Sequence, residues 1–276
     1  MTQVLVVGEA LVDVVVELDG RRNERPGGSP ANVAVGLARL GHRVQLLTAL
    51  GDDAHGALLR EHLAEVAVTA APLARTSTAV ARLDETGSAS YEFDITWDLA
   101  GATAEAPWLH VGSLATVLAP GADAVLELAQ RAPRLSFDPN CRPDIAPRDL
   151  DRVEQLAGLS TVVKLSDEDL AWLYPETPFE DVADRWLTGR AELVVLTRGA
   201  EGADAVSEQG RLHVPTAEGG PIIDTVGAGD AFMAGLLDGL FRGLSHQQAL
   251  ERAALVARRT CERAGADPPR AAELAS

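Results

Sequence analysis

Residues 224–232 read Asp-Thr-Val-Gly-Ala-Gly-Asp-Ala-Phe, so two glycines come just before a carboxylate and the start of an apolar run. Gly227 and Gly229 have no Cβ, which lets the backbone turn tightly and approach a ligand closely. The apolar residues 231–237 predict a buried helix whose free first-turn amides and positive dipole end face the turn. Such a turn binds phosphate. Asp230, among these donors, can take a proton from an attacking hydroxyl while the amides stabilise a transferring phosphoryl group.

A second segment in which glycines expose the backbone at the start of a predicted helix lies near the N-terminus. Residues 27–41 read Gly-Gly-Ser-Pro-Ala-Asn-Val-Ala-Val-Gly-Leu-Ala-Arg-Leu-Gly. We predict that Ser29 is the N-cap of this helix, that Pro30 is its first residue and that Gly41 marks its end. Asn32, in the first turn, can donate to and accept from a polar ligand. Taken alone, the turn at Asp230 is equally consistent with an ordinary helix cap. It is not a Walker A loop, because the chain contains no Gly-x-x-x-x-Gly-Lys-Ser/Thr.

Short apolar runs alternate with helical patterns along the chain. This alternation predicts an α/β fold, with a mainly parallel, doubly wound sheet and helices on both faces. Ligands of such sheets bind at the carboxyl ends of the strands. The apolar runs are 4–7, 12–18, 44–47, 109–111, 135–137, 162–163 and 193–196, and the helical patterns are 54–66, 121–131, 149–157, 167–173, 179–188, 230–241 and 246–263.

Residues 78–93 break the alternation. They predict a hairpin of two alternating strands around a Glu-Thr-Gly turn. Paired with residues 14–18, the hairpin would form a small sheet separate from the main one. A plain surface hairpin is the alternative.

The composition limits the classes of partner and compartment. The chain has 276 residues, 46% of them hydrophobic, enough to bury the core of a single domain spanning 1–276. Its formal charge of −17 argues against nucleic acid or an anionic membrane surface as partner. No apolar run reaches the roughly 20 residues that span a bilayer. Cys141 and Cys261 are too few for a disulfide framework, so we expect a cytoplasmic protein with free thiols.

The two glycine segments, at 27–41 and 224–232, resemble the N-terminal and C-terminal signature regions of the ribokinase-like (PfkB) family of carbohydrate kinases. The resemblance spans nearly the whole chain, from residues 8–13, Gly-Glu-Ala-Leu-Val-Asp, to residues 263–266. It implies ATP-dependent phosphorylation of a primary hydroxyl of a small sugar, with Mg²⁺ as cofactor. The small sheet, formed by about 13–25 and 78–97, would then be a lid over the sugar and, in several family members, a homodimer surface.

Fructose is the first expected substrate. The segments 8–13 and 27–32, together with the Asp-Pro-Asn-x-Arg run at 138–142, look like those of fructokinases. A ribokinase or nucleoside kinase is the alternative activity. A catalytically silent sugar or nucleotide sensor on the same fold is an alternative from another class, which the presence of Asp230 disfavours. An NAD enzyme is disfavoured because no Gly-x-Gly-x-x-Gly follows the first strand.

The resemblance also assigns site residues. Asp230 would be the base, and the amides of Gly227, Ala228 and Gly229 would stabilise the phosphoryl group. The sugar would be held by Asp13, Gly28, Asn32, Asn140 and Asp230, and the nucleotide by Lys164, Ser166, Thr197, Gly199, Gly202, Gly227 and Gly229.

The metal ligands are less clear from the sequence. Ser166 is a plausible N-cap, and Asp169 completes a variant capping box. The family has Asn-x-x-Glu here, a pattern linked to metal and phosphate, so the departure leaves Glu168 and Asp169 as competing candidates. Asp224 matches a residue that binds a monovalent cation in some relatives, which leaves a need for K⁺ open.

Overall fold

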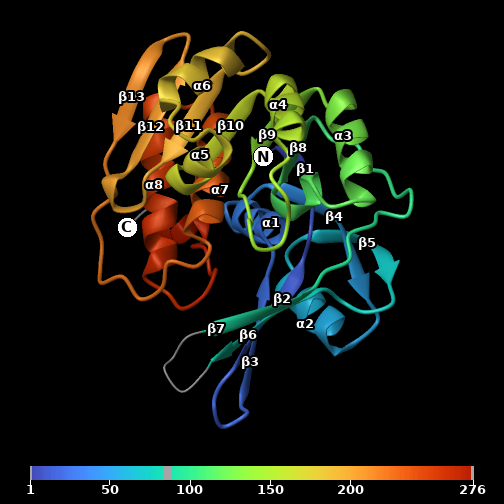
Figure 1. The fold of residues 1–276 in the computed structure, drawn as a ribbon. Coiled ribbons are helices and arrows are strands. Elements are labelled where there is room, and N and C mark those ends of the chain that lie inside the picture. Colours follow the sequence, from blue (N-terminus) through green and yellow to red (C-terminus); the bar gives the residue numbers. More distant parts are fainter. Residues whose placement is uncertain (1, 84–88, 275–276) are drawn as a thin grey trace.

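The computed structural model describes residues 2–83 and 89–274 (Figure 1). In these residues a nine-stranded sheet has the order β13-β12-β11-β10-β9-β8-β1-β4-β5. All neighbouring pairs from β11 to β5 are parallel, whereas β12 and β13 add an antiparallel edge. The strands of this sheet are β1 (Gln3–Val7), β4 (Arg43–Gly51), β5 (Ala67–Leu73), β8 (Trp108–Gly112), β9 (Arg134–Asp138), β10 (Val162–Ser166), β11 (Leu193–Thr197), β12 (Ala203–Ser207) and β13 (Gly210–Val214).

Helices cover both faces of this sheet, which confirms the predicted fold class. Along β1, Val4 and Val6 belong to one buried cluster while Leu5 and Val7 belong to the other, as the two-residue period of a strand requires. The first cluster packs against α1, α2, α7 and α8, and the second against α3 to α6. The helices are α1 (Ser29–Arg39), α2 (Ala54–His62), α3 (Gly121–Arg131), α4 (Leu150–Leu159), α5 (Asp167–Leu173), α6 (Phe179–Leu187), α7 (Ala228–Phe241) and α8 (His246–Cys261), with 3₁₀ turns η1 (Ser113–Thr116), η2 (Gly199–Glu201) and η3 (Ala271–Leu274).

The order of the strands reverses at β1, because β4 lies on one side of it and β8 on the other. A crevice forms at the carboxyl ends of strands where such a reversal occurs. Glu9 comes shortly after β1, Ser113 directly after β8, and Asp138 ends β9. The topology therefore brings these polar residues to one end of the sheet.

A second sheet, four-stranded in the described residues, has the order β3-β2-β6-β7 and projects away from the main sheet (Figure 1). The predicted hairpin is confirmed, since β6 and β7 pair antiparallel. Its Glu-Thr-Gly turn lies outside the described residues. We call this sheet the lid; its strands are β2 (Leu11–Val16), β3 (Arg22–Gly27), β6 (Thr78–Leu83) and β7 (Ala89–Asp94).

Several boundaries differ from the expectations. The apolar run at 12–18 ends as a strand at Val16, because the chain turns at Gly20 and returns as β3. The helical pattern at 54–66 ends at His62, and that at 246–263 ends at Cys261. In residues 2–83 and 89–274, none of the helices combines the length and apolar character needed to cross a membrane.

Candidate active site

Asp230 lies in the first turn of α7, directly after the glycine turn. Gly227 is the N-cap with φ of 74°, and a Cβ there would lie 2.5 Å from that of Ala266, so the turn requires glycine. The Ala228 amide donates to the Thr225 carbonyl at 3.1 Å. The amide of Ala228, one of the three predicted to stabilise the phosphoryl group, is thus already used. The amides of Gly227 and Gly229 have no protein acceptor in the described part of the chain.

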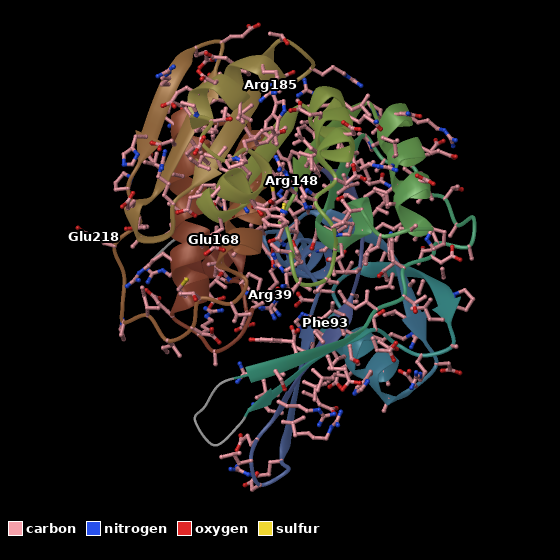
Figure 2. The ribbon with its side chains drawn as sticks, in the orientation of Figure 1. Arg39, Phe93, Arg148, Glu168, Arg185 and Glu218 are labelled. Carbon is pink, nitrogen blue, oxygen red and sulfur yellow. The ribbon has the colours of Figure 1, made fainter. Side chains whose placement is uncertain are left out.

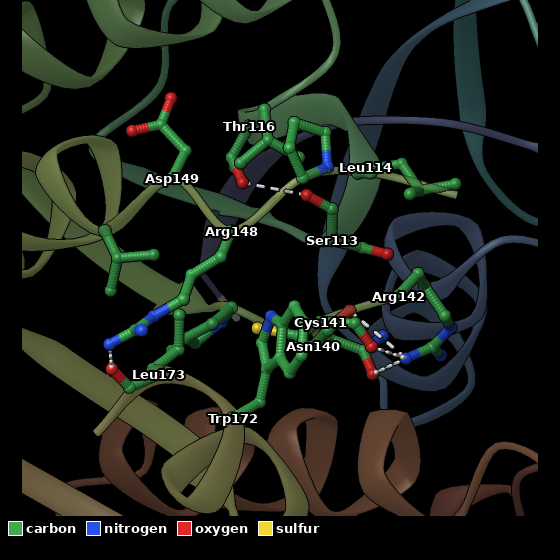
Figure 3. Close-up of a pocket in the computed structure, with 15 residues that line it drawn as sticks. Ser113, Leu114, Thr116, Asn140, Cys141, Arg142, Arg148, Asp149, Trp172 and Leu173 are labelled. Carbon is green, nitrogen blue, oxygen red and sulfur yellow. Dashed lines mark hydrogen bonds between the residues drawn. The ribbon is translucent and has the colours of Figure 1, made fainter. Parts of the chain in front are cut away.

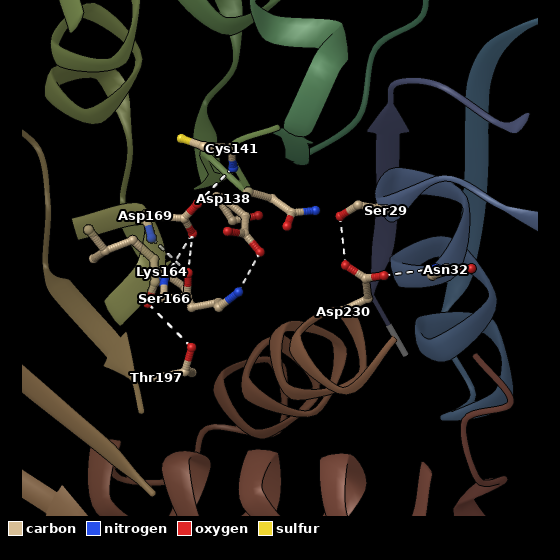
Figure 4. A network of polar contacts seen from close by, with 12 residues as sticks. Ser29, Asn32, Asp138, Cys141, Lys164, Ser166, Asp169, Thr197 and Asp230 are labelled. Atoms are coloured by element: carbon tan, nitrogen blue, oxygen red, sulfur yellow. Dashed lines mark hydrogen bonds and ion pairs between the residues drawn. The ribbon is translucent and has the colours of Figure 1, made fainter. Parts of the chain in front are cut away.

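Helix α1 supplies two donors to the Asp230 carboxylate (Figure 4). Ser29 Oγ donates to Asp230 Oδ1 at 2.6 Å, and Asn32 Nδ2 donates to Oδ2 at 2.8 Å. The predicted capping role of Ser29 is wrong: Gly28 is the N-cap of α1, with no side-chain cap bond. Asp230 is only 8% exposed, and burial raises its pKa although both hydrogen bonds act to lower it. The geometry is that of a desolvated, oriented carboxylate suited to accepting a proton.

A cavity of about 680 Å³ lies between the lid and the main sheet and reaches Asp230. Its volume is within the usual range for small-molecule sites. Phe93 on β7 lines it from the lid (Figure 2). Of the predicted sugar ligands, the cavity is lined by Asp13, Gly28, Asn32 and Asp230.

Asp13 is exposed on β2 and faces this cavity. Strand β2 places Asp13 at the cavity wall rather than in the core, because its neighbours Val12 and Val14 point the other way and are buried. Partial burial still raises the pKa of Asp13, although Arg142 acts to lower it.

Asn140 lies apart from this cavity and lines a smaller one of about 20 Å³ (Figure 3). That volume is close to what a single water needs, so the small cavity holds no substrate. Arg142 lines both cavities, and its Nη1 donates to Asn140 Oδ1 at 2.7 Å and to the Cys141 carbonyl at 2.9 Å. Asn140 thus helps to hold the Arg142 guanidinium at the wall of the large cavity.

Glu9 was not predicted from the sequence, yet it is 4% exposed and lines the large cavity. Its Oε2 accepts the Ala115 amide at 3.0 Å, and burial raises the pKa of Glu9 to about 7. A buried carboxylate is costly without partners. Glu9 lies two residues after a parallel strand, at the edge where ligands bind, and that position was the signal available in the sequence.

The predicted nucleotide residues lie on the other side of Asp230 (Figure 4). Ser166 and Thr197 are register partners at the ends of β10 and β11. Gly199 and Gly202 both have positive φ, and a Cβ on Gly202 would lie 2.1 Å from the Val214 carbonyl. These glycines therefore set the turn after β11. Lys164 is 3% exposed, and its Nζ donates to Asp138 Oδ2 at 2.8 Å.

Residues 1–272 of the chain match the sequence pattern of the pfkB family of carbohydrate kinases. The chain belongs to this family. It is accordingly an ATP-dependent carbohydrate kinase, as its two glycine signatures predict.

Individual family members agree in sequence and structure. The chain is 35% identical to fructokinase from Salmonella typhimurium over 265 residues, which covers 86% of this chain and 84% of the relative. A crystal structure of fructokinase with bound ATP from Xylella fastidiosa has a TM-score of 0.87 at 28% identity, covering 99% of this chain and 97% of the other. Fructokinase from Vibrio cholerae with fructose, ADP and calcium ion has a TM-score of 0.85 at 29% identity, covering 100% and 98%.

The predicted metal ligands of this pfkB kinase differ in whether their carboxylate oxygens are already hydrogen-bonded. Asp169 is buried and already accepts from the Cys141 amide at 2.7 Å and from Ser166 N and Oγ, which confirms the predicted capping box. Glu168 is exposed on α5 (Figure 2). Asp138 Oδ1, in contrast, is buried without a hydrogen-bond partner in the described residues.

These groups fit a largely hydrated Mg²⁺, which binds through few carboxylates and keeps several waters. No group of three or more His, Cys, Asp or Glu suited to enclosing a metal occurs in residues 2–83 and 89–274. For potassium the fit is poor. Asp224 already accepts the amides of Val226 at 3.1 Å and Gly265 at 2.8 Å, and Arg25 lies 3.5 Å away.

Proposed function

We propose that this kinase phosphorylates a primary hydroxyl of fructose with ATP. The observation that carries the proposal is the convergence, at Asp230, of a sugar-sized cavity on one side and the glycine turn with its free amides on the other. The named relatives support fructose as the substrate, since the Vibrio cholerae enzyme was crystallised with fructose and ADP.

The sugar is held between the lid and the main sheet. Asp13 accepts hydrogen bonds from sugar hydroxyls. Gly28 lines the same cavity, and the packing of the chain requires glycine there because a Cβ would lie 2.5 Å from the Glu9 carbonyl oxygen. Asn32 has a buried Oδ1 without a partner in the described residues, so it can accept one more hydroxyl. The Phe93 ring supplies apolar surface from the lid, and a closed lid excludes water from the reaction.

Phosphoryl transfer then needs one proton acceptor and charge stabilisation. The sugar hydroxyl gives its proton to Asp230 as its oxygen forms a bond to the γ-phosphorus, and the bond to the bridging oxygen breaks so that ADP leaves with the electron pair. The amides of Gly227 and Gly229 stabilise the transferring oxygens. Magnesium, when bound, supplies neutralisation of phosphate charge. Most of the acceleration comes from positioning and electrostatics.

A screen that couples ADP release to a spectroscopic signal tests this function across sugars and nucleosides. We expect fructose to give the highest kcat/KM and Asp230→Asn to lower the rate of ADP release by about 10² or more. Preference for a riboside or ribose would replace fructose by the alternative activity. Binding of ligands with no ADP release from any of them would identify a sensor instead.

We also propose a cytoplasmic location and keep the homodimer as a prediction. Cys141 and Cys261 are both free thiols, which suits a reducing compartment.

On the lid side, Leu18 and Tyr91 are exposed by 66% and 62%, so this side has apolar side chains that a second copy could cover. Light scattering of the purified chain measures the oligomeric state.

A further inference from the structure

Lys164 is the only lysine in the chain, and it is almost completely buried at 3% exposure. An ammonium carries three donors. The only hydrogen bond of Nζ in residues 2–83 and 89–274 is the one to Asp138 Oδ2 at 2.8 Å. The other oxygen of the same carboxylate, Asp138 Oδ1, is buried without a partner in that part of the chain. The ion pair is therefore incompletely satisfied on both sides.

An ion pair of this kind is expensive, because desolvation of both charges can exceed their attraction unless further hydrogen bonds complete the site. The unused donors of the ammonium therefore point to a ligand that supplies acceptors to Lys164. A chain with a formal charge of −17 also has to attract phosphate through local cations. Arg142, the other nearby cation, already donates to Asn140 and to the Cys141 carbonyl.

The ammonium lies directly beside the glycine turn. A Cβ built on Gly229 would be 3.3 Å from Lys164 Nζ, and no other described atom beyond the turn itself lies within 4 Å of it. Figure 4 shows the side chain of Lys164 extending from β10 toward the space between Asp138 and Asp230. Any phosphoryl group held by the Gly229 amide is thus within reach of Lys164.

We propose that Lys164 is a catalytic residue that donates to an oxygen of the phosphoryl group in transit, and that Asp138 is the positioning residue that holds it there. This inference rests on the proposed kinase function. Lys164 stays protonated throughout, while the proton of the sugar goes to Asp230. Burial lowers the pKa of Lys164, but the carboxylates of Asp138, Asp169 and Asp230 more than offset this effect, so the pKa lies above its usual value.

Binding to the γ-phosphoryl group predicts selectivity between nucleotides. Lys164→Met keeps the length of the side chain and removes the charge. We expect kcat to fall about 100-fold or more, an order reported for the loss of one charge-stabilising donor. The affinity for a non-hydrolysable ATP analogue, measured by calorimetry, should fall about tenfold while the affinities for ADP and fructose change less than about twofold.

A second variant separates catalysis from stability. Lys164→Met alone leaves the Asp138 charge buried and unpaired, which destabilises the fold. The double variant Lys164→Met/Asp138→Asn removes both charges, so its melting temperature should recover toward that of the wild type. Its kcat and its weakened preference for the ATP analogue should not recover. A double variant with wild-type kcat would overturn the proposal, as would equal losses for ADP and the analogue.

The single lysine also permits a test on the unmodified protein. Selective ¹⁵N labelling of lysine gives one side-chain resonance, that of Lys164 Nζ. Addition of the ATP analogue with fructose should shift this resonance, whereas ADP with fructose should leave it near its free position. Equal shifts with both nucleotides would contradict contact with the γ-phosphoryl group. If the wild-type chain releases no ADP with any sugar, the kinase function itself fails, an outcome that the variants do not produce.

Discussion

Ser29 Oγ donates to Asp230 Oδ1 at 2.6 Å, although 201 positions separate the two residues in the chain. The bond connects the first residue of α1 to the first turn of α7. Because it stabilises the ionised form of Asp230, the proposed base, this bond should help to set the pH at which Asp230 accepts a proton.

Ser29→Ala removes this donor, so the pKa of Asp230 should rise further. A hydrogen bond to a charged group contributes about 1.5–3 kcal/mol, which corresponds to roughly one to two pKa units. We expect the acidic limb of the kcat/KM profile to move upward by about one unit. Ser160→Ala is the matched control, because Ser160 is also buried but its hydroxyl donates to the Leu156 carbonyl and, among residues 2–83 and 89–274, to no carboxylate. Overlapping profiles for wild type and Ser29→Ala would refute the role of the bond.

Asp230→Asn removes the base and keeps the size of the side chain. We expect kcat to fall by about 10² or more, the usual order for loss of general-base catalysis, with little change in the binding of fructose or ATP. Steady-state kinetics and calorimetry measure the two effects separately. A variant with near-normal kcat would remove Asp230 from the reaction.

Asp13→Ala should weaken sugar binding about tenfold to a hundredfold, because each lost charged hydrogen bond costs about 1.5–3 kcal/mol. Nucleotide affinity without sugar should stay unchanged. Since Asp13 is exposed on β2, its removal should cost little stability. Asp94→Ala is the control: it removes an exposed lid carboxylate that pairs with Arg75 and lies outside the cavity. Equal losses for sugar and nucleotide would indicate a damaged fold.

Glu9→Gln should stabilise the protein increasingly as the pH rises. Burial raises the pKa of Glu9 from 4.5 to about 7, so the folded state holds a proton that the unfolded state has lost between these values. Its contribution to stability is complete below pH 4.5 and is lost as the pH rises through about 7. The difference in unfolding free energy between variant and wild type should grow by up to about 3 kcal/mol over this range. Denaturant titrations at pH 5 and 8 measure it, and a constant difference would contradict a buried, protonated Glu9.

The elements that could be predicted best from the sequence are those with a local signal of their own, such as an apolar run or a capping box. The apolar runs predicted at 162–163 and 193–196 form the slightly longer strands β10 and β11, and the helix predicted at 167–173 appears with those bounds, because its capping box is a local feature. Strand β3, with the sequence Arg-Asn-Glu-Arg-Pro-Gly, has no apolar alternation and forms only because β2 pairs with it. Strand β5 contains Pro72 and was missed, as were β12 and β13 at the edge of the sheet.

The candidate site divides in the same way. The glycine turn and Asp230 could be predicted from local residues, since a turn and a helix start are local features. The contact between Ser29 and Asp230, the burial of Glu9 and the exposure of Asp13 depend on how distant elements pack. The capping interpretation of Ser29 was wrong because tertiary structure offered its hydroxyl a partner with a negative charge.

The location of the base on α7 and of its two donors on α1 has a consequence for biosynthesis. A nascent polypeptide that has left the ribosome only as far as β13 already contains the strands of the lid and all nine strands of the main sheet, yet it lacks both the glycine turn and Asp230. Such an unfinished polypeptide lacks part of the cavity wall as well as the proposed base, so it has no means of transferring phosphate. Competence arises only when the last quarter of the sequence is translated and docks, so truncated products should waste no ATP.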